Sequence, residues 1–408
     1  MTSTSTIAEH HEGDPRGDAT AGLEKHTKKN AGALVFTAFE PSGDAHAAPV
    51  IAELRERVPW LRIYAWGGPL MEQAGATLME NTVGGASMGL GAISRIVKVR
   101  KQIRSVRRWS QQYRVLGHVA VDSPAANFPI CKAMRKRGAR VIHLVAPQLW
   151  AWGGWRTRKL RRLTDIVLCL LPFEEEWFTR RHIPAKFIGH PIINRKLELN
   201  EVTAQAQGLP QGAPRVAIFP GSRAHEVKAN LPLLVKTFNE LQARHGGMGG
   251  IIVASSPEIA RLIKKKVKIF PTGLHLTIGL VDAAILWCDL ALCVSGTISL
   301  QIASHRKPMI GVYKTSVLSW LGSKLILRTP FCLLPNIVAG REIVPEFVPH
   351  VGGSGPIVRE ASSYLSDSKH GAVQSEELAR VCSRFANKRP GKEAARWIIK
   401  LLTYGEVQ

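Results

Sequence analysis

Short apolar runs alternate with longer stretches of mixed polarity along most of the chain. The runs contain four to six residues and lie at 33–38, 63–66, 118–121, 141–145, 166–170, 215–219, 250–254, 289–294 and 308–312. Runs of this length, separated by stretches with helical spacing, are typical of buried strands that alternate with helices. The pattern predicts an α/β fold of two Rossmann-like, doubly wound domains that face each other across a cleft.

A polar stretch with several glycines and prolines separates the two groups of runs at 196–214. We interpret this stretch as a linker between Rossmann-like domains at 31–195 and 215–385. Residues 1–30 are polar and lack the apolar segment of a signal peptide, so a disordered tail is expected. Residues 386–408 are predicted to hold an amphipathic helix, whose apolar face is formed by Ala394, Ala395, Ile398, Leu401 and Leu402.

Two turns in the second half of the chain have the features of an anion-binding site. Pro-Gly-Ser-Arg at 220–223 follows the run at 215–219, and Ser-Gly-Thr at 295–297 follows the run at 289–294. A turn between a strand and a helix exposes backbone N–H groups at the positive helix end, and glycine lets a ligand approach closely. One such turn is common in α/β proteins and can be purely structural. Two of them, one with Arg223 able to fork onto a phosphate, favour a nucleotide diphosphate.

The chain carries a large positive charge, since 55 Lys and Arg residues against 31 Asp and Glu residues leave a formal net charge of +24. Such an excess favours an anionic partner, with an unspecific contribution to solubility as the alternative. Residues 93–114 form a basic amphipathic pattern typical of a membrane-surface helix, although a core-facing helix with a solvated basic side fits equally well. A second basic cluster consists of Arg156, Arg158, Lys159, Arg161 and Arg162.

Several classes of protein are disfavoured by the composition. No apolar run reaches the length of about 18 residues that spans a bilayer, so any membrane contact is expected to be peripheral. No zinc finger and no RNA-binding signature with interleaved aromatic residues is present, which argues against nucleic acid as a partner. The six cysteines lack a Cys-x-x-Cys spacing, so we expect buried thiols in a reducing cytoplasm. Asp and His residues do not cluster at ligand spacing, and we expect no metal and no cofactor.

A series of short motifs follows a specific order between residues 33 and 347. They are Glu40-Pro41-Ser42-Gly43-Asp44-Ala45-His46, Gly67-Gly68-Pro69-Leu70-Met71, Ser87-Met88-Gly89, Val121-Asp122-Ser123-Pro124 with Asn127, Pro147-Gln148-Leu149-Trp150-Ala151-Trp152, Leu171-Pro172-Phe173-Glu174, Gly189-His190-Pro191, Pro220-Gly221-Ser222-Arg223 with Glu226, Ser295-Gly296-Thr297, and Leu334-Pro335-Asn336 through Ala339-Gly340-Arg341 to Val344-Pro345-Glu346-Phe347. In these motifs the chain resembles lipid-A-disaccharide synthase, a family of inverting glycosyltransferases with the two-Rossmann GT-B fold.

The resemblance implies that the chain joins UDP-2,3-diacylglucosamine to 2,3-diacylglucosamine 1-phosphate, which yields a β-1,6-linked disaccharide phosphate and UDP. Both implied substrates are anionic and acylated, which suits a basic protein bound peripherally to the inner face of the cytoplasmic membrane. The first domain is then expected to bind the acceptor and to face the membrane, and the second domain is expected to bind the UDP-sugar.

Inverting transfer needs a base that takes the proton of the acceptor 6-hydroxyl as this oxygen attacks the anomeric carbon. Asp122 directly follows the run at 118–121 and matches the family's essential aspartate, so it is the predicted general base. The alternative is a cap for a helix that starts near Pro124. Arg223, together with the two glycine turns, is predicted to stabilise the leaving UDP without a metal ion.

The resemblance also implies two sets of binding residues. The predicted donor-site residues are Gly221, Ser222, Arg223, Glu226, Ser295, Gly296, Thr297, Gln301, Asn336 and Arg341. The predicted acceptor-side residues are Ser42, Gly43, Asp44, His46, Met88, Asn127, Trp150 and Trp152. Gln301 is expected to contact a ribose hydroxyl. Structural roles are the alternatives for several members, namely helix capping by Glu226, a structural His46, loop roles for Asn336 and Arg341, and core packing of Trp150 and Trp152.

The chain departs from the family pattern at several positions. Charged family residues are replaced at Ala92, Ala125, Gly153 (an arginine in the family), Asn194 and Gln301, and Phe39 replaces a glycine. Because most of these changes fall on the acceptor side, UDP binding is the firmer expectation. The alternatives are a divergent GT-B transferase or epimerase with another acceptor, and a non-catalytic protein that binds a nucleotide sugar or a membrane.

Overall fold

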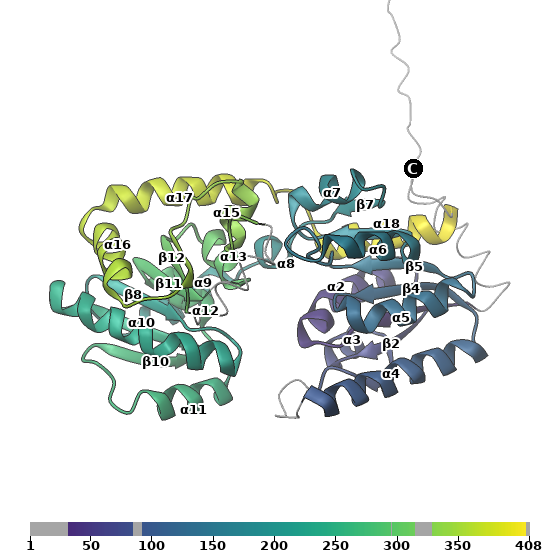
Figure 1. Cartoon of the computed structure of the whole chain (residues 1–408), viewed down its shortest axis with the longest axis horizontal. Helices are drawn as coiled ribbons and strands as arrows, with labels where there is room; N and C mark the ends of the chain where they lie inside the picture. The colour runs from purple at the N-terminus through teal and green to yellow at the C-terminus, as the bar shows by residue number, and fades with distance from the viewer. Residues whose placement is uncertain (1–31, 85–91, 295, 315–328, 405–408) are drawn as a thin grey trace, which may run out of the picture.

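The computed structural model describes residues 32–84, 92–294, 296–314 and 329–404. The expected disordered tail at 1–30 lies outside these residues. Two lobes lie side by side, and each is built around one parallel sheet covered by helices (Figure 1). The α/β fold with two Rossmann-like units, which the apolar runs predict, is therefore confirmed.

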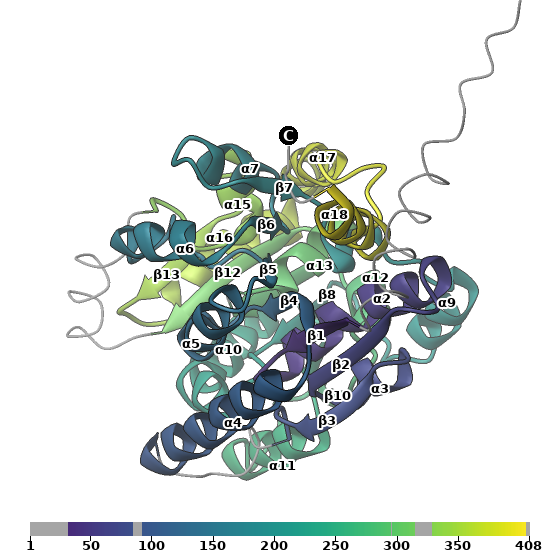
Figure 2. The ribbon, with the colours of Figure 1, turned by 90° about the vertical axis from the view of Figure 1, so that its right-hand side faces the viewer.

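The first lobe contains a seven-stranded sheet in the order β3-β2-β1-β4-β5-β6-β7. Its strands are β1 (Ala33–Thr37), β2 (Arg62–Gly67), β3 (Thr77–Asn81), β4 (Val115–Val121), β5 (Arg140–Leu144), β6 (Ile166–Cys169) and β7 (Ala185–Phe187). The covering helices are α2 (Pro41–Arg57), α3 (Pro69–Gln73), α4 (Ala92–Gln112), α5 (Pro124–Arg135), α6 (Thr157–Leu163) and α7 (Pro172–Thr179). Helices α4, α5 and α6 cover one face of this sheet and α2 the other (Figure 2), so its central strands are buried on both sides and read as continuous apolar runs.

The second lobe contains a six-stranded sheet in the order β10-β9-β8-β11-β12-β13. Its strands are β8 (Arg215–Phe219), β9 (Gly249–Ala254), β10 (Leu274–Ile278), β11 (Leu290–Val294), β12 (Met309–Lys314) and β13 (Glu346–His350). The helices are α10 (Ala224–Arg244), α11 (Pro257–Lys266), α12 (Val281–Trp287), α13 (Ile298–Ser304), α15 (Leu334–Ala339), α16 (Gly355–Ser366) and α17 (Ser368–Ser383). Helices α10, α11 and α16 pack on one face, while α12, α13 and α17 pack on the other.

Each sheet has one point at which the direction of strand addition reverses. In the first sheet this point lies between β1 and β4, and in the second it lies between β8 and β11. The helices that leave two such strands diverge to opposite faces, which opens a crevice at the carboxyl ends of the strands. Asp122 follows β4, and the two glycine turns follow β8 and β11. The topology therefore places all three predicted features at reversal points.

An apolar cluster, here called the joint, connects the lobes. It combines Trp150 and Leu171 of the first lobe with Leu300 and Val338 of the second, and Phe385 lies buried among them. The chain crosses beside the joint through α8 (Pro191–Asn194) and α9 (Leu199–Gln207). The expected linker at 196–214 thus contains a helix, and Ala206 and Leu209 of this stretch pack into the second lobe. The domain boundaries themselves stay a prediction.

Helix α18 (Pro390–Tyr404) returns the chain to the first lobe, where it packs on α2 (Figure 1). Its apolar residues are buried in the same core as Ile51 and Leu54 of α2; they are Ala394, Ala395, Ile398, Ile399 and Leu401. The first lobe is therefore assembled from both ends of the described chain.

We expect Phe385→Ala to weaken the joint. Phe385 is fully buried, with its ring edge-on to Phe187 at 5.8 Å between centroids. Removing a buried aromatic ring costs about 3–5 kcal/mol. Phe238→Ala is the matched control, because Phe238 is equally buried but packs only within the second lobe. Both variants should lower the free energy of unfolding in urea, whereas only Phe385→Ala should increase the radius of gyration in X-ray scattering. An unchanged radius in this variant would show that the joint does not hold the lobes.

Candidate active site at the sheet reversal points

Asp122 lies in a strained turn at the carboxyl end of β4. Asp122 and Ser123 have φ angles of +47° and +38°, which only a few per cent of non-glycine residues adopt. Such backbone strain clusters at functional sites. Ser123, not Asp122, is the N-cap residue of α5, and neither side chain caps that helix. Among the described residues, no hydrogen bond or ion pair engages the half-buried Asp122 carboxylate, so this group is available to a ligand.

A network of buried polar side chains fixes the backbone of the Asp122 turn. Asn127 donates to the carbonyls of Val121 (3.0 Å) and Asp122 (2.8 Å), and its Oδ1 accepts a hydrogen bond from Thr37 Oγ1 (2.6 Å). Because the Thr37 hydroxyl donates its hydrogen to Asn127, its oxygen accepts a hydrogen bond from Nε2–H of His118 at 2.8 Å. Burial lowers the pKa of His118 to about 3, which keeps its ring neutral. Asn127, predicted to face the acceptor, is fully buried and instead fixes the backbone that presents Asp122.

The motif at 42–46 has mostly structural roles. Asp44 is buried, and its carboxylate accepts hydrogen bonds from the backbone N–H groups of Gly68 (3.1 Å), Leu70 (3.1 Å) and Met71 (3.0 Å). This carboxylate ties α2 to the start of α3, and its predicted contact with the acceptor stays a prediction. Gly43 is needed for close packing, since a Cβ there would lie 2.9 Å from the Cβ of Ala38.

Two other residues of this motif have different surroundings. His46 is largely enclosed, and its ring lies edge-on to His190 at 6.3 Å between centroids. Burial lowers the pKa of His46, so this ring favours its neutral form. Ser42 is exposed in the first turn of α2 and is the member of the motif left open to a ligand.

One carboxylate near the Asp122 turn was not predicted: Glu40 accepts a hydrogen bond from Ser123 Oγ at 3.3 Å.

On the donor side, Glu226 occupies the turn at 220–223. Its Oε2 accepts from the backbone N–H groups of Ser222 (3.1 Å) and Arg223 (3.2 Å), and its Oε1 accepts from the Arg223 guanidinium at 3.0 Å. Gly221 has a φ of +106° and makes room for Glu226, because a Cβ there would lie 2.7 Å from it. The amides expected to bind a pyrophosphate are thus already paired. The Arg223 side chain is 65% exposed and Ser222 is exposed as well, so these two side chains of the turn remain open to a ligand.

The second glycine turn and Gln301 have separate surroundings. Gly296 (φ +147°) and Thr297 are exposed at the end of β11, next to the turn after β8, while Ser295 lies outside the described residues. Gln301 does not face this turn, since it donates to Asp282 at 3.0 Å. The same Asp282 oxygen accepts from His305 (2.8 Å) and pairs with Arg195. The predicted ribose contact of Gln301 is not favoured, because its amide is bound beside the joint.

Asn336 and Arg341 are likewise engaged in protein contacts. Asn336 is fully buried: its Oδ1 accepts from the N–H groups of Ile343 (2.8 Å) and Val344 (2.9 Å), and its Nδ2 donates to the Val344 carbonyl (2.8 Å) and to Glu346 (2.7 Å). These bonds use the hydrogen-bonding capacity of its side chain and support the alternative of a loop-structural role, while its place in the nucleotide site stays a prediction. Arg341 is exposed and pairs with Glu377 of α17.

The two predicted tryptophans have different environments. Trp150 is buried in the joint, where its Nε1–H donates to Glu174 at 2.9 Å and its ring lies edge-on to Phe173. The alternative of core packing is therefore correct for Trp150. Trp152 is 46% exposed and stacks on Arg156, whose guanidinium carbon lies 3.9 Å from the ring centroid. Met88 lies outside the described residues.

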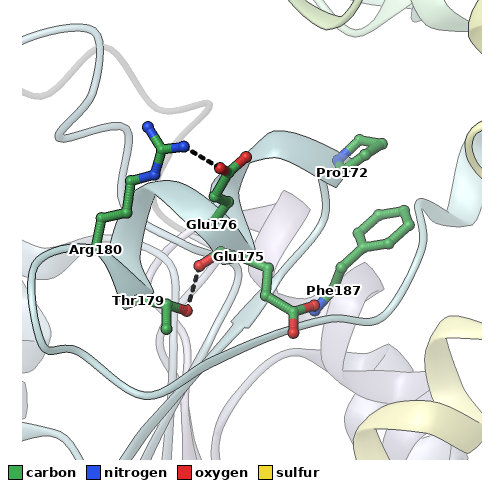
Figure 3. A pocket seen from close by; sticks show the side chains of 6 residues that line it. All are labelled: Pro172, Glu175, Glu176, Thr179, Arg180 and Phe187. Carbon is green, nitrogen blue, oxygen red and sulfur yellow. Dashed lines mark hydrogen bonds and ion pairs between the residues drawn. The ribbon is translucent and has the colours of Figure 1, made fainter.

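One hollow of the described surface lies away from this site. It has a volume of about 530 Å³ and lies between α7 and β7, the edge strand farthest from β3 (Figure 3). Its charged side chains pair locally: Glu176 with Arg180, and Glu175 with Lys186 and the Phe187 N–H. Since none of its carboxylates is left unpaired, we assign no chemistry to this hollow.

Two features are absent from the described residues. No three His, Cys, Asp or Glu side chains gather there in a group able to hold a metal ion. Within the same residues, no helix combines the length and the apolar character needed to cross a membrane.

Two parallel-sheet lobes with crevices at their reversal points define the GT-B class, which includes sugar-nucleotide transferases and epimerases. A spinosyn rhamnosyltransferase solved with thymidine diphosphate has a TM-score of 0.60 at 11% identity, with 90% of this chain and 99% of that chain covered. A UDP-GlcNAc 2-epimerase from Neisseria meningitidis, solved with UDP-GlcNAc, has a TM-score of 0.56 at 13% identity, covering 90% and 98%. At these identities the likeness shows the fold alone.

The sequence comparisons resolve the family. The model of the lipid-A-disaccharide synthetase family matches residues 34–396. A lipid-A-disaccharide synthase of Burkholderia pseudomallei is 34% identical over 345 residues, which cover 82% of this chain and 87% of the relative. A lipid-A-disaccharide synthase of Solibacter usitatus is 29% identical over 378 residues, covering 92% and 98%. The chain therefore belongs to the lipid-A-disaccharide synthase family.

We expect the buried Glu174 to make stability depend on pH. Burial raises the pKa of Glu174 to about 7 against an ordinary value of 4.5, so the folded protein keeps a proton that the unfolded chain releases. The stabilising contribution of the protonated form is full below about pH 4.5 and is lost as the pH rises toward 7, on the order of 3 kcal/mol in total. Chemical denaturation at pH 5 and pH 8 should therefore show a smaller loss of stability for Glu174→Gln than for the unmodified chain.

Glu176→Gln is the matched control, because Glu176 lies on the same helix in an exposed pair with Arg180. This control should keep the full pH dependence. An identical pH dependence in Glu174→Gln and the unmodified chain would contradict the assignment.

Proposed function

We propose that this chain transfers a diacylated glucosamine from UDP to the 6-hydroxyl of a diacylglucosamine 1-phosphate, with inversion and without a metal ion. Membership of the family makes the chain a hexosyltransferase of lipid A disaccharide synthesis, with a UDP-sugar donor and a lipid-sugar acceptor. The observation that carries the proposed mechanism is the Asp122 carboxylate, which is presented by a strained turn and held in place by Asn127.

Asp122 acts as the general base in this mechanism. Its carboxylate takes the proton of the acceptor hydroxyl while the hydroxyl oxygen forms a bond to the anomeric carbon of the donor. The bond between that carbon and the diphosphate oxygen breaks at the same time, and the electron pair leaves with UDP. Because attack and departure take place on opposite sides of the carbon, the configuration inverts. The rigid support from Asn127 and Thr37 supplies the positioning that such a step requires.

Arg223 stabilises the negative charge that develops on the departing UDP. The carboxylate of Glu226 orients this guanidinium and caps α10 at the same time. The exposed turn at Gly296 and Thr297 follows the neighbouring strand, so it belongs to the same crevice as Arg223.

The basic helix α4 supports a peripheral position on an anionic membrane. Val106 and Trp109 point into the first lobe, which agrees with the core-facing interpretation of this half of the helix. Ile96 and Val97 are 52% and 60% exposed near the start of the helix, and exposed cations follow them; these are Arg100, Lys101, Arg104, Arg107 and Arg108. Exposed apolar side chains beside cations suit the interface of an anionic bilayer. We place the chain at the inner face of the cytoplasmic membrane on this basis.

We expect Asp122→Asn to lower kcat by about 10²–10⁴-fold, because an amide cannot accept the hydroxyl proton. Release of UDP from the diacylated donor, with and without acceptor, measures the effect, and titration with UDP should show unchanged donor binding. Glu40→Gln is the control, since it removes the neighbouring carboxylate near the same turn. A Glu40→Gln loss larger than that of Asp122→Asn would move the role of base to Glu40.

We expect Arg223→Ala to weaken UDP binding and to lower kcat by about 10²-fold, and Arg223→Lys to restore little, since an ammonium lacks the forked geometry. Arg261→Ala is the matched control, because Arg261 forms an exposed pair with Glu258 on α11 at 2.9 Å, much as Arg223 does with Glu226. Calorimetric titration with UDP and steady-state kinetics would check both effects. Equal behaviour of the Arg223 and Arg261 variants would exclude a role of Arg223 at the donor.

A further inference from the structure

The segment after β5 holds an arginine between two exposed indoles. The guanidinium carbon of Arg156 lies 3.9 Å from the ring centroid of Trp152 and 5.6 Å from that of Trp155. These rings are 46% and 77% exposed, and Trp155 is the most exposed of the tryptophans among the described residues. Cation–π contact fixes the guanidinium plane against Trp152, so the side chain loses less freedom on binding a ligand.

Gly153 makes this arrangement possible. It has a φ of +71°, and a Cβ built on it would lie 2.6 Å from Nη2 and 2.7 Å from Nε of Arg156. Any other residue would push the guanidinium off Trp152. The family has an arginine at position 153, and this chain has a glycine there. This glycine lies where the guanidinium of Arg156 folds back toward the backbone.

The Arg156 guanidinium has no partner for its hydrogen-bond donors within the described residues. It forms no hydrogen bond or ion pair there, and its Nε is buried without an acceptor. An anionic ligand would satisfy the free donors of this guanidinium. Residues 145–164 contain no Asp or Glu, and four further cations lie within six positions of Arg156, namely Arg158, Lys159, Arg161 and Arg162. The surroundings therefore favour an anion.

The position of the segment indicates which anion this is. It follows β5, the neighbour of β4, and the Asp122 N–H donates to the Leu144 carbonyl at 2.9 Å. Trp150 anchors the segment to Glu174 in the joint. The segment that carries Arg156 therefore leaves the sheet at the same edge as the turn of the proposed base, in the lobe opposite the donor turns.

We infer that Arg156, stacked on Trp152, binds the phosphate monoester of the acceptor. This inference rests on the proposed function, and it identifies how the chain selects a phosphorylated lipid sugar over one with a free 1-hydroxyl. A planar guanidinium suits this role because it forms two parallel hydrogen bonds to a phosphate.

The test compares two acceptors that differ only in the 1-phosphate, both presented in detergent micelles. Arg156→Ala should raise KM for the phosphorylated acceptor by about 10–100-fold and KM for the 1-hydroxyl acceptor by less than about threefold, with kcat nearly unchanged. Arg161→Ala is the control, since it removes an exposed charge from α6, the helix that begins directly after Arg156. Gly153→Ala should resemble Arg156→Ala although it removes no charge, because its Cβ displaces the guanidinium.

The alternative source of phosphate is a membrane lipid. Sedimentation with phosphatidylglycerol vesicles should show the same binding for Arg156→Ala as for Arg161→Ala. Loss of vesicle binding in Arg156→Ala alone, with KM unchanged in micelles, would assign the residue to a lipid headgroup and overturn the inference. Equal KM changes for both acceptors would also overturn it while leaving the transfer reaction intact. Absence of transfer by the unmodified chain to either acceptor would instead refute the proposed function.

Discussion

The apolar joint between the lobes is the contact on which the rest of the site depends. Asp122 follows a strand of the first sheet, and Arg223 lies in a turn that follows a strand of the second. The distance between the two side chains therefore depends on the contact that fixes one lobe against the other. Trp150, Leu300 and Phe385 meet in that contact. Trp150 also begins the segment that carries Arg156, and its bond to Glu174 fixes this segment to α7. One buried cluster therefore holds the two lobes and the acceptor-side segment together.

Much of the fold could be predicted from the sequence because central strands of parallel sheets are buried on both faces. β1 and β11, for example, are buried along their whole length and read as continuous apolar runs. β3, β7, β10 and β13 were not predicted, since these edge strands are only partly covered and carry mixed residues. The helix α9 was missed for a related reason, because it buries little more than Val202 and Ala206.

The position of a candidate site residue could be predicted where the residue lies in a turn that directly follows a buried strand. Asp122 and Arg223 are of this kind, since the motif order and the reversal points select them together. Asp44, Asn336 and Gln301 belong to the same motifs but bind protein groups instead. Their partners lie far along the chain or on a loop whose path is set by packing, which local patterns do not encode. Arg156 was missed as an individual residue for the same reason, because its stacking depends on the conformation of Gly153.

Helix α18 has a consequence for the way the protein is made. The core of the first lobe includes Ala395 and Ile398 as well as α2, so its packing closes only after the second lobe has been synthesised. During translation, α2 emerges before α18 and leaves an apolar face uncovered until α18 has been synthesised. A fragment cut at the crossover would expose the surface of α2 that α18 covers in the full chain.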